Sequence, residues 1–199
     1  MPPRSSVRRA RPRVAALLVA AALALSACAA TASSFDPRGA CVADGIAAGA
    51  YPDLEARIPT RFEDRAPSTL ESGRHCTATS LGSLVADGFT EIRFAGGTWD
   101  FGGNRAAALV VFRAAGLTPE AIARFYTESA RAADRTRVTG ESSPTLAGHL
   151  VRRLDSRTGA RIQAVVVWSA TDPDVVNVVL TNDLPDPKIE AAVAAFDDP

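Results

Sequence analysis

Three cysteines, Cys28, Cys41 and Cys76, are the side chains with the widest range of chemistry in this 199-residue chain. A cysteine can carry a lipid, join a second cysteine in a disulfide or ligate a metal ion. Cys76 directly follows His75, and such a pair could begin a metal site. No Cys-x-x-Cys motif accompanies it, so we expect neither a metal ion nor another cofactor.

The residues before Cys28 fall into three zones that are typical of an exported protein. Residues 1–13 contain five arginines and no acidic residue, and residues 14–25 contain no polar side chain. This apolar run is too short to span a bilayer core of about 30 Å as a helix. A basic segment followed by such a run is the pattern of a secretory signal. We therefore expect residues 1–27 to be a signal peptide.

The sequence Leu25-Ser26-Ala27-Cys28 resembles the lipobox of bacterial lipoproteins. The resemblance implies that a diacylglycerol is attached to Cys28 and that the chain is cleaved after Ala27. The lipid would then anchor the mature protein to the outer face of a membrane in the cell envelope. Two alternatives stay open, namely cleavage of an ordinary signal near Ala22-Leu23-Ala24 and an uncleaved anchor formed by residues 14–32.

The other two cysteines are expected to pair with each other. If Cys28 carries lipid, Cys41 and Cys76 remain, and two cysteines outside the cytoplasm usually form a disulfide. The alternatives are two free thiols or a metal site with His75. We expect a disulfide that ties the N-terminal segment to the domain. Residues 28–40 are small and polar without periodicity, which predicts a flexible tether, and residues 41–199 are expected to form a single domain.

The charge of the mature chain differs from that of the full sequence. The signal segment holds five of the 22 basic residues and none of the 22 acidic residues, so the mature chain has a net charge of −5. A mildly acidic domain lacks the basic surface that nucleic-acid binding requires. The expected partner is the membrane, through the lipid on Cys28, and no nucleic acid is expected.

Motifs for catalysis or metal binding are absent from the sequence. His75 and His149 are the only histidines, and the chain contains neither a G-x-S-x-G elbow nor an H-E-x-x-H motif. Four acidic residues near the ends of predicted strands could bind calcium: Asp172, Asp174, Asp183 and Asp186. Turn-forming and helix-capping roles explain such residues without a metal, and Asp186 suits the N-cap of the last helix. We predict that the protein is not an enzyme.

The clearest predicted helix covers residues 118–133. Thr118 can cap it, Pro119 suits its first turn, and apolar or small side chains recur at helical spacing. That stripe comprises Ile122, Phe125, Tyr126, Ser129, Ala130 and Ala133. A second helix is expected over residues 187–197, and shorter helical segments over 53–58 and 77–87. Alternating or continuously apolar runs predict strands at 89–95, 105–113, 136–143, 148–154, 161–169 and 175–182.

Short turns rather than helical crossovers join most of the predicted strands, which favours antiparallel pairing. The expected fold class is α+β, a mainly antiparallel sheet with helices packed on one face. The region 53–197 also looks like uncharacterised α+β domains of secreted bacterial lipoproteins. The phrases Phe94-Ala-Gly-Gly-Thr-Trp99 and Val178-Val-Leu-Thr-Asn-Asp-Leu-Pro185 carry this resemblance, which implies no activity.

A glycine-rich hairpin at residues 96–104 presents Trp99 and Phe101, either as contacts for a ligand or partner or as part of the core. We favour the core. Phe94 and Trp99 lie an odd number of residues apart, so a regular strand would place them on opposite faces. A β-bulge at Gly96-Gly97 would bring both onto the face that meets the helix stripe, and we predict that bulge.

The leading functional hypothesis is a lipid-anchored extracytoplasmic domain with a non-enzymatic binding or envelope-supporting role. The alternative is a carrier that holds a lipid or other apolar molecule in a cavity between sheet and helix, and a hydrolase is the least favoured class. A carrier requires an apolar pocket of about 300–1,000 Å³. An interaction module requires an exposed apolar patch instead.

Replacing Cys28 tests the lipid anchor. We expect Cys28→Ala to move the protein from the membrane fraction to the soluble extracytoplasmic fraction, or to leave it unprocessed, because the lipid acceptor is lost. Cell fractionation followed by mass measurement of the N-terminus checks this. Normal cleavage together with unchanged membrane attachment would contradict the lipobox assignment.

Overall fold

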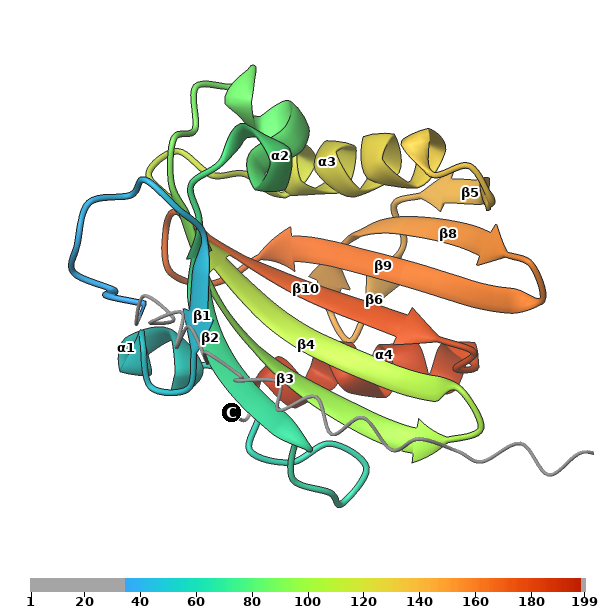
Figure 1. Ribbon diagram of the computed structural model, residues 1–199. Helices are drawn as coiled ribbons and strands as arrows, with labels where there is room; N and C mark the ends of the chain where they lie inside the picture. The colour runs from blue at the N-terminus through green and yellow to red at the C-terminus, as the bar shows by residue number, and fades with distance from the viewer. Residues whose placement is uncertain (1–34, 198–199) are drawn as a thin grey trace, which may run out of the picture. The chain divides into compact units, whose positions relative to one another are not determined.

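The computed structural model describes residues 35–197. The expected signal peptide, Cys28 and the first part of the expected tether, residues 28–34, lie outside the described residues. The central element of the described chain is a large antiparallel sheet, with helices packed against it (Figure 1).

Eight strands form this sheet in the order β1-β2-β3-β4-β10-β9-β8-β5, and each neighbouring pair is antiparallel. The strands are β1 (Gly45–Ala47), β2 (Thr69–His75), β3 (Ile92–Gly102), β4 (Arg105–Arg113), β5 (Thr136–Ser142), β8 (Arg152–Thr158), β9 (Arg161–Ser169) and β10 (Val175–Asn182). A separate two-stranded ribbon consists of β6 (Thr145–Leu146) and β7 (His149–Leu150). The predicted α+β class with a mainly antiparallel sheet is confirmed.

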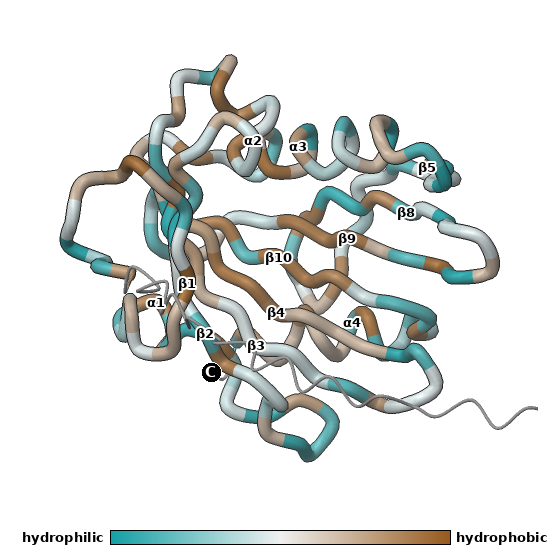
Figure 2. The backbone as a smooth tube through the Cα atoms, in the orientation of Figure 1, coloured by the Kyte–Doolittle hydropathy of each residue, from teal (hydrophilic) through white to brown (hydrophobic). Residues whose placement is uncertain are grey.

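The central strands bury side chains on both faces. Along β4, Leu109 and Val111 belong to one hydrophobic cluster, whereas Phe112 belongs to a second cluster on the opposite face. β9 and β10 alternate in the same way, and the central stretches of these strands are the hydrophobic part of the sheet (Figure 2). Strands that are apolar on both faces need a covering layer on each side.

Helices accordingly cover both faces, whereas we expected them on one. One face carries α3 (Pro119–Ala132), α2 (Ala78–Leu81) and the short 3-10 helix η1 (Gly82–Val85). The other carries α1 (Pro52–Glu55) and α4 (Asp186–Ala194), which continues into the 3-10 helix η2 (Ala195–Asp197). We call these the α3 face and the α4 face. The short alternating runs indicated the strands, but not that both faces of the central strands would be covered.

The two long helices begin differently from each other. The Thr118 hydroxyl accepts a hydrogen bond from the Ala121 N–H and caps α3, as its position predicts. Asp186 does not cap α4, because the N-cap residue is Pro185 and no side chain caps that end. The Asp186 carboxylate instead pairs with the guanidinium of Arg153 at 2.8 Å.

Residues 35–40 belong to the folded domain rather than to a flexible tether. The guanidinium of Arg74 lies over the ring of Phe35. It also donates hydrogen bonds to the backbone carbonyls of Asp36, Gly39 and Ala40. Arg74 is itself buried in β2, so the group that binds this segment has a fixed place in the sheet. The sequence of the segment is polar, but its contacts come from elsewhere in the chain.

The predicted disulfide between Cys41 and Cys76 is present, with the two Cα atoms 5.4 Å apart. Beside it, the Asp44 carboxylate accepts hydrogen bonds from the N–H groups of Cys76 and Thr77 and from the hydroxyls of Thr77 and Ser80. Partial burial acts to raise the pKa of Asp44, but these hydrogen bonds outweigh it and hold the pKa well below its usual range. Crosslink and carboxylate together fix the N-terminal segment to the start of α2.

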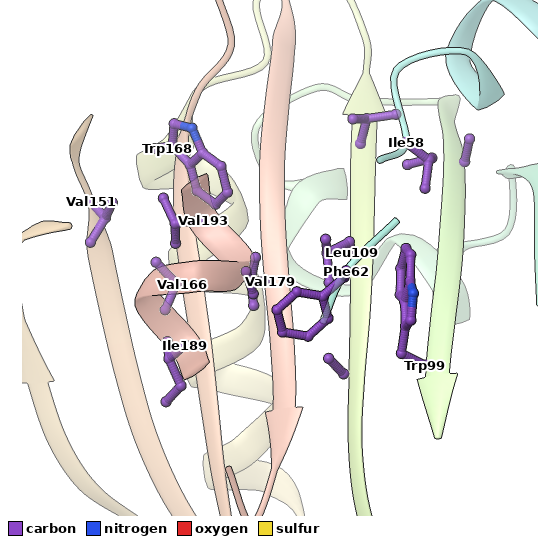
Figure 3. Close-up of a cluster of buried hydrophobic side chains, with 14 of the residues drawn as sticks. Ile58, Phe62, Trp99, Leu109, Val151, Val166, Trp168, Val179, Ile189 and Val193 are labelled. Carbon is purple, nitrogen blue, oxygen red and sulfur yellow. The ribbon is translucent and has the colours of Figure 1, made fainter. Parts of the chain in front are cut away.

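Trp99 is buried, but on the α4 face rather than the α3 face. Its pairing register with β4 is regular from Arg93 to Asp100, so the predicted bulge at Gly96-Gly97 is wrong. The indole packs edge-on against Phe62, at 6.0 Å between ring centroids, and its N–H donates to the Arg65 carbonyl at 2.9 Å. Figure 3 shows this ring among side chains that converge from the sheet and α4.

Gly97 leaves room for the Trp99 ring on the α4 face. A Cβ atom at this position would lie 2.9 Å from the Trp99 ring and 2.9 Å from Ile58. The glycine therefore lets the indole and the covering residues approach the strand, which is a packing role and not that of a bulge. The register does shift between Asp100 and Gly102, at the end of β3.

Removing the indole tests the covered α4 face. Trp99 is 1 % exposed, and we expect Trp99→Ala to lower the free energy of unfolding by about 3–5 kcal/mol. Chemical denaturation measures this loss. Ile162→Ala, at a half-exposed position of β9, is the control and should change stability little. A Trp99→Ala variant as stable as the wild type would contradict the core role.

Candidate functional site

A cavity of about 350 Å³ lies on the α3 face, between the C-terminal half of α3 and the sheet. We call it the α3 cavity. Its roof is the helix stripe of Tyr126, Ser129 and Ala130, three residues of the predicted core-facing stripe. Its floor comes from strands β3, β4, β8, β9 and β10, and Thr136 at the start of β5 closes one side.

Side-chain size along the sheet explains why this space is open. Near the N-terminus of α3, the α3 face carries Phe94, Phe112 and Val176 in one cross-strand row. Further along the same strands, the residues of β4 on this face are Ala108 and Ala106. The large residues fill the layer beneath the helix. The methyl groups of Ala106 and Ala108 are too small to do so, and the space above them stays open.

Apolar and polar residues occupy successive cross-strand rows of the floor. Leu180, Val165 and Leu154 pair across β10, β9 and β8 and form an apolar row beneath the helix. The next row toward the strand ends consists of Asn182, Gln163 and Ser156. Two residues further along each strand, the surface therefore changes from hydrocarbon to amide and hydroxyl groups. We call this polar row, together with Thr136, the rim.

Hydrogen bonds connect three of the rim residues, Asn182, Gln163 and Thr136, the last of them through Thr158. The Gln163 amide donates to the Asn182 side-chain oxygen at 2.9 Å, and the Thr158 hydroxyl donates to the Gln163 oxygen at 3.4 Å. The Thr136 and Thr158 hydroxyls lie 2.7 Å apart. This chain orients the amides and leaves the Asn182 NH₂ group and spare oxygen lone pairs for a ligand. None of the described residues that line the α3 cavity carries a charge.

Among the described residues that line the cavity, Tyr126 has the one ionisable side chain. Burial raises the pKa of its phenol, so the hydroxyl stays protonated. No residue among those described forms a hydrogen bond with this hydroxyl, and a ligand could accept one from it. The cavity is half open to solvent, and it can hold a small molecule that is largely apolar and carries a neutral polar group.

The residues singled out in the glycine-rich hairpin do not contribute to this cavity. Trp99 is core of the α4 face, so the core interpretation is confirmed for it. Phe101 is half-buried and packs on Phe62, with the cationic groups of Arg65 and Lys188 about its ring. Both aromatic side chains therefore lie on the side of the sheet opposite the cavity.

The four acidic residues that could have bound calcium each have a separate partner. Their groups contact the following: Asp172 the guanidinium of Arg57, Asp174 the N–H of Gly116, Asp183 the N–H of Ile162 and Asp186 the guanidinium of Arg153. Within residues 35–197, no three metal-ligating side chains come together. These aspartates act in turns and ion pairs between elements.

The two histidines lie in different places. The Asp197 carboxylate accepts a hydrogen bond at 2.9 Å from Nε2 of His149, which also lies beside Trp168. His149 and Ser169 line one open pocket, but no hydrogen bond within the described chain joins them. His75 stacks on Phe94, with ring centroids 4.7 Å apart. Neither histidine lines the α3 cavity.

The sequence predicts the helix residues of the roof but not the rim. Tyr126, Ser129 and Ala130 belong to the predicted helix stripe, whereas Gln163 and Asn182 lie near the ends of strands that are predicted to be apolar. The available signal was a polar residue at an inward position near one end of two adjacent strands. That signal becomes specific only when the register places the two amides side by side.

Comparisons with known proteins do not indicate a function for this chain. No protein-family model and no curated protein matches the chain. Among the described helices, none is long and apolar enough to cross a membrane.

Titration of His75 predicts how stability depends on pH. Burial lowers the pKa of His75, and the nearby Asp44 carboxylate offsets only part of this effect. Below about pH 6.5, the ordinary histidine pKa, the unfolded chain binds a proton that the folded protein does not. We therefore expect the free energy of unfolding to fall as the pH decreases through this range. The decrease should end below the lowered folded pKa.

Denaturation at a series of pH values checks this. His75→Phe keeps a ring that can stack on Phe94 and removes the titrating group, so its stability should vary less between pH 7 and pH 5. An unchanged slope in His75→Phe would show that another group causes the dependence.

Proposed function

We propose that this protein is a lipid-anchored extracytoplasmic binding protein that holds a small, largely apolar molecule in the α3 cavity. The proposal adopts the carrier hypothesis over a purely envelope-supporting role. The observation that carries it is a cavity of about 350 Å³ with an apolar floor and a neutral hydrogen-bonding rim. This volume falls within the range of small-molecule sites, which are mostly apolar with a few placed polar groups.

The composition of the cavity wall supports binding over simple imperfect packing. Apolar surface left open to water beneath a helix is unfavourable, because burial of apolar surface is what stabilises a protein interior. A ligand would bury that surface along the row of Leu180, Val165 and Leu154. The rim supports the same interpretation, because its amides are oriented by one another and retain unused hydrogen-bonding groups.

The expected anchor suits such a role. A lipid on Cys28 would hold the domain near a bilayer, where apolar molecules are concentrated. The described domain begins at Phe35, so only a short segment would separate the lipid from the domain. Delivery to or removal from the membrane is then a step over a short distance. The expected activity is binding, without a chemical reaction.

Filling the cavity tests the proposal. Ala130 forms part of the roof, and a helix side chain at this position extends over the turn that contains Tyr126. We expect Ala130→Trp to place its indole in the α3 cavity and to exclude a ligand. The full chain is incubated with a photoactivatable fatty alcohol, and the labelled peptides are mapped by mass spectrometry. In the wild type, label should attach to α3 and to the ends of β4 and β10.

Ala132→Trp is the matched control, because it makes the same change two residues away at an exposed position of the same helix. Label in the cavity peptides should fall at least tenfold in Ala130→Trp and stay at the wild-type level in Ala132→Trp. Thermal denaturation of both variants confirms that they fold. Wild-type protein that takes up no label at these peptides, or equal labelling in folded Ala130→Trp, would overturn the proposed function.

A further inference from the structure

A second, smaller space lies beside the α3 cavity. It has a volume of about 220 Å³, and we call it the side cavity. Three residues line both spaces, namely Tyr126, Leu154 and Val165. Along the helix, the α3 cavity extends to Ala130 and the side cavity to Ala123. The two spaces are therefore neighbours beneath consecutive turns of α3.

The floor beneath Tyr126 continues from one space to the other. Leu154 and Val165 are direct cross-strand partners, and Val167, two residues along β9, lies in the side cavity. All three side chains are apolar. With a rise of 1.5 Å per residue, the distance along the helix from Ala130 to Ala123 is about 10 Å. The floor thus forms an apolar strip along the helix, and the Tyr126 side chain borders both spaces over that strip.

No hydrogen bond fixes the Tyr126 side chain. Its ring packs edge-on against Phe125, with ring centroids 5.3 Å apart, and against the hydrophobic cluster of the α3 face. Its hydroxyl has no hydrogen-bond partner among the described residues, so a rotation of the ring displaces apolar contacts but breaks no hydrogen bond. A displaced Tyr126 ring would join the two spaces.

The distribution of charge limits what the joined space could hold. Among the described residues, the wall of the α3 cavity has no charged side chain, and the charged groups of the side cavity are already paired. Arg152 there pairs with Glu120 at 2.9 Å, Arg153 with Asp155 at 2.9 Å, and Glu141 with Arg131 at 2.5 Å. Above its apolar floor, the side cavity also has the hydroxyl side chains of Thr127, Ser142 and Ser143. An ionised head group would therefore lose water at the rim without gaining an opposite charge. An uncharged polar head can instead hydrogen-bond to Asn182 and Gln163.

We propose that the ligand is a linear hydrocarbon chain with an uncharged hydrogen-bonding head, such as a glyceride, a fatty alcohol or a fatty amide. This inference rests on the proposed binding function and specifies its ligand. The head lies at the rim, and the chain extends along the apolar strip and past Tyr126 into the side cavity. Tyr126 acts as a movable divider, and its size sets the longest chain that the site encloses.

Competition with a series of monoacylglycerols of increasing chain length tests this inference. Each compound competes, below its micellar concentration, with the photoactivatable fatty alcohol for labelling of the full chain. While the chain remains inside the site, the concentration for half displacement should fall about fourfold per added methylene. Beyond the enclosed length, further methylenes should bring no gain. The length at which the gain stops is the measured quantity.

Tyr126 variants should move that length in opposite directions. Tyr126→Ala removes the divider and should extend the gain to longer chains, whereas Tyr126→Trp should end it at shorter ones. Ala132→Trp, which changes an exposed position of the same helix outside both spaces, is the control and should keep the wild-type profile. Tyr126→Trp keeps the test valid where Tyr126→Ala lowers stability. The same profile in wild type and both folded variants would overturn the role of Tyr126.

The head group is tested with fatty acids of the same chain lengths. We expect an ionised fatty acid to require at least a tenfold higher concentration than the matching monoacylglycerol. Equal or stronger competition by the fatty acid would overturn the uncharged head. Failure of every monoacylglycerol to compete, while Ala130→Trp still blocks labelling, would overturn this inference and leave the binding function intact. Absence of labelling in the cavity would overturn the binding function itself.

Discussion

The central strands β4, β9 and β10 are apolar on both faces, and the rest of the described structure follows from the need to cover both. Val178 and Val179 are adjacent in β10 and completely buried, one in the cluster of the α3 face and one in that of the α4 face. If either face were left uncovered, these apolar side chains would be exposed to water, which is unfavourable. Each face is therefore covered by helices, α2 and α3 on one side and α1 and α4 on the other (Figure 1).

The two covering layers differ in completeness. On the α4 face, Trp99, Trp168 and Ile189 are buried almost entirely, and Figure 3 shows Ile189 and Val193 of α4 directed toward the sheet. On the α3 face, the hydrophobic cluster includes Ala121 and Ile122 in the first turn of the helix, whereas the side cavity begins at Ala123 and the α3 cavity lies under the C-terminal half. Because protein interiors are normally close-packed, an opening with an ordered polar rim differs from the packing elsewhere in the same domain. That contrast is the physical basis for assigning function to the α3 face.

The N-terminal segment is bound to the domain by groups that lie far along the chain. Arg74 binds the carbonyls of residues 36–40, and the Cys41–Cys76 disulfide closes the same segment onto β2 and α2. These links fix the first described residues, from Phe35 onward, to the sheet.

The strongest local patterns in the sequence predicted elements that the structure contains. The strands 105–113, 161–169 and 175–182 have the predicted bounds, and α3 begins after Thr118 because its cap and Pro119 act within a few residues. The pairing of Cys41 with Cys76 was also predictable, because two cysteines of a domain that is expected to be exported usually pair. Periodicity and capping depend on residues close together in the sequence, and the number of cysteines can be counted. None of these properties depends on contacts between distant residues.

Contacts between distant residues decided the rest. A bulge at Gly96-Gly97 was a reasonable way to bury Trp99 against one helical layer, but the residues around Ile58 and Phe62 cover the other face and make it unnecessary. Asp186 had the composition of a helix cap, yet Arg153 on β8 binds it. The rim has the same origin, because Gln163 and Asn182 become a pair only through the register of β9 and β10. By itself the sequence determined the elements and the crosslink. Which faces they cover, and where a cavity remains between them, depended on side chains that only the tertiary structure brings together.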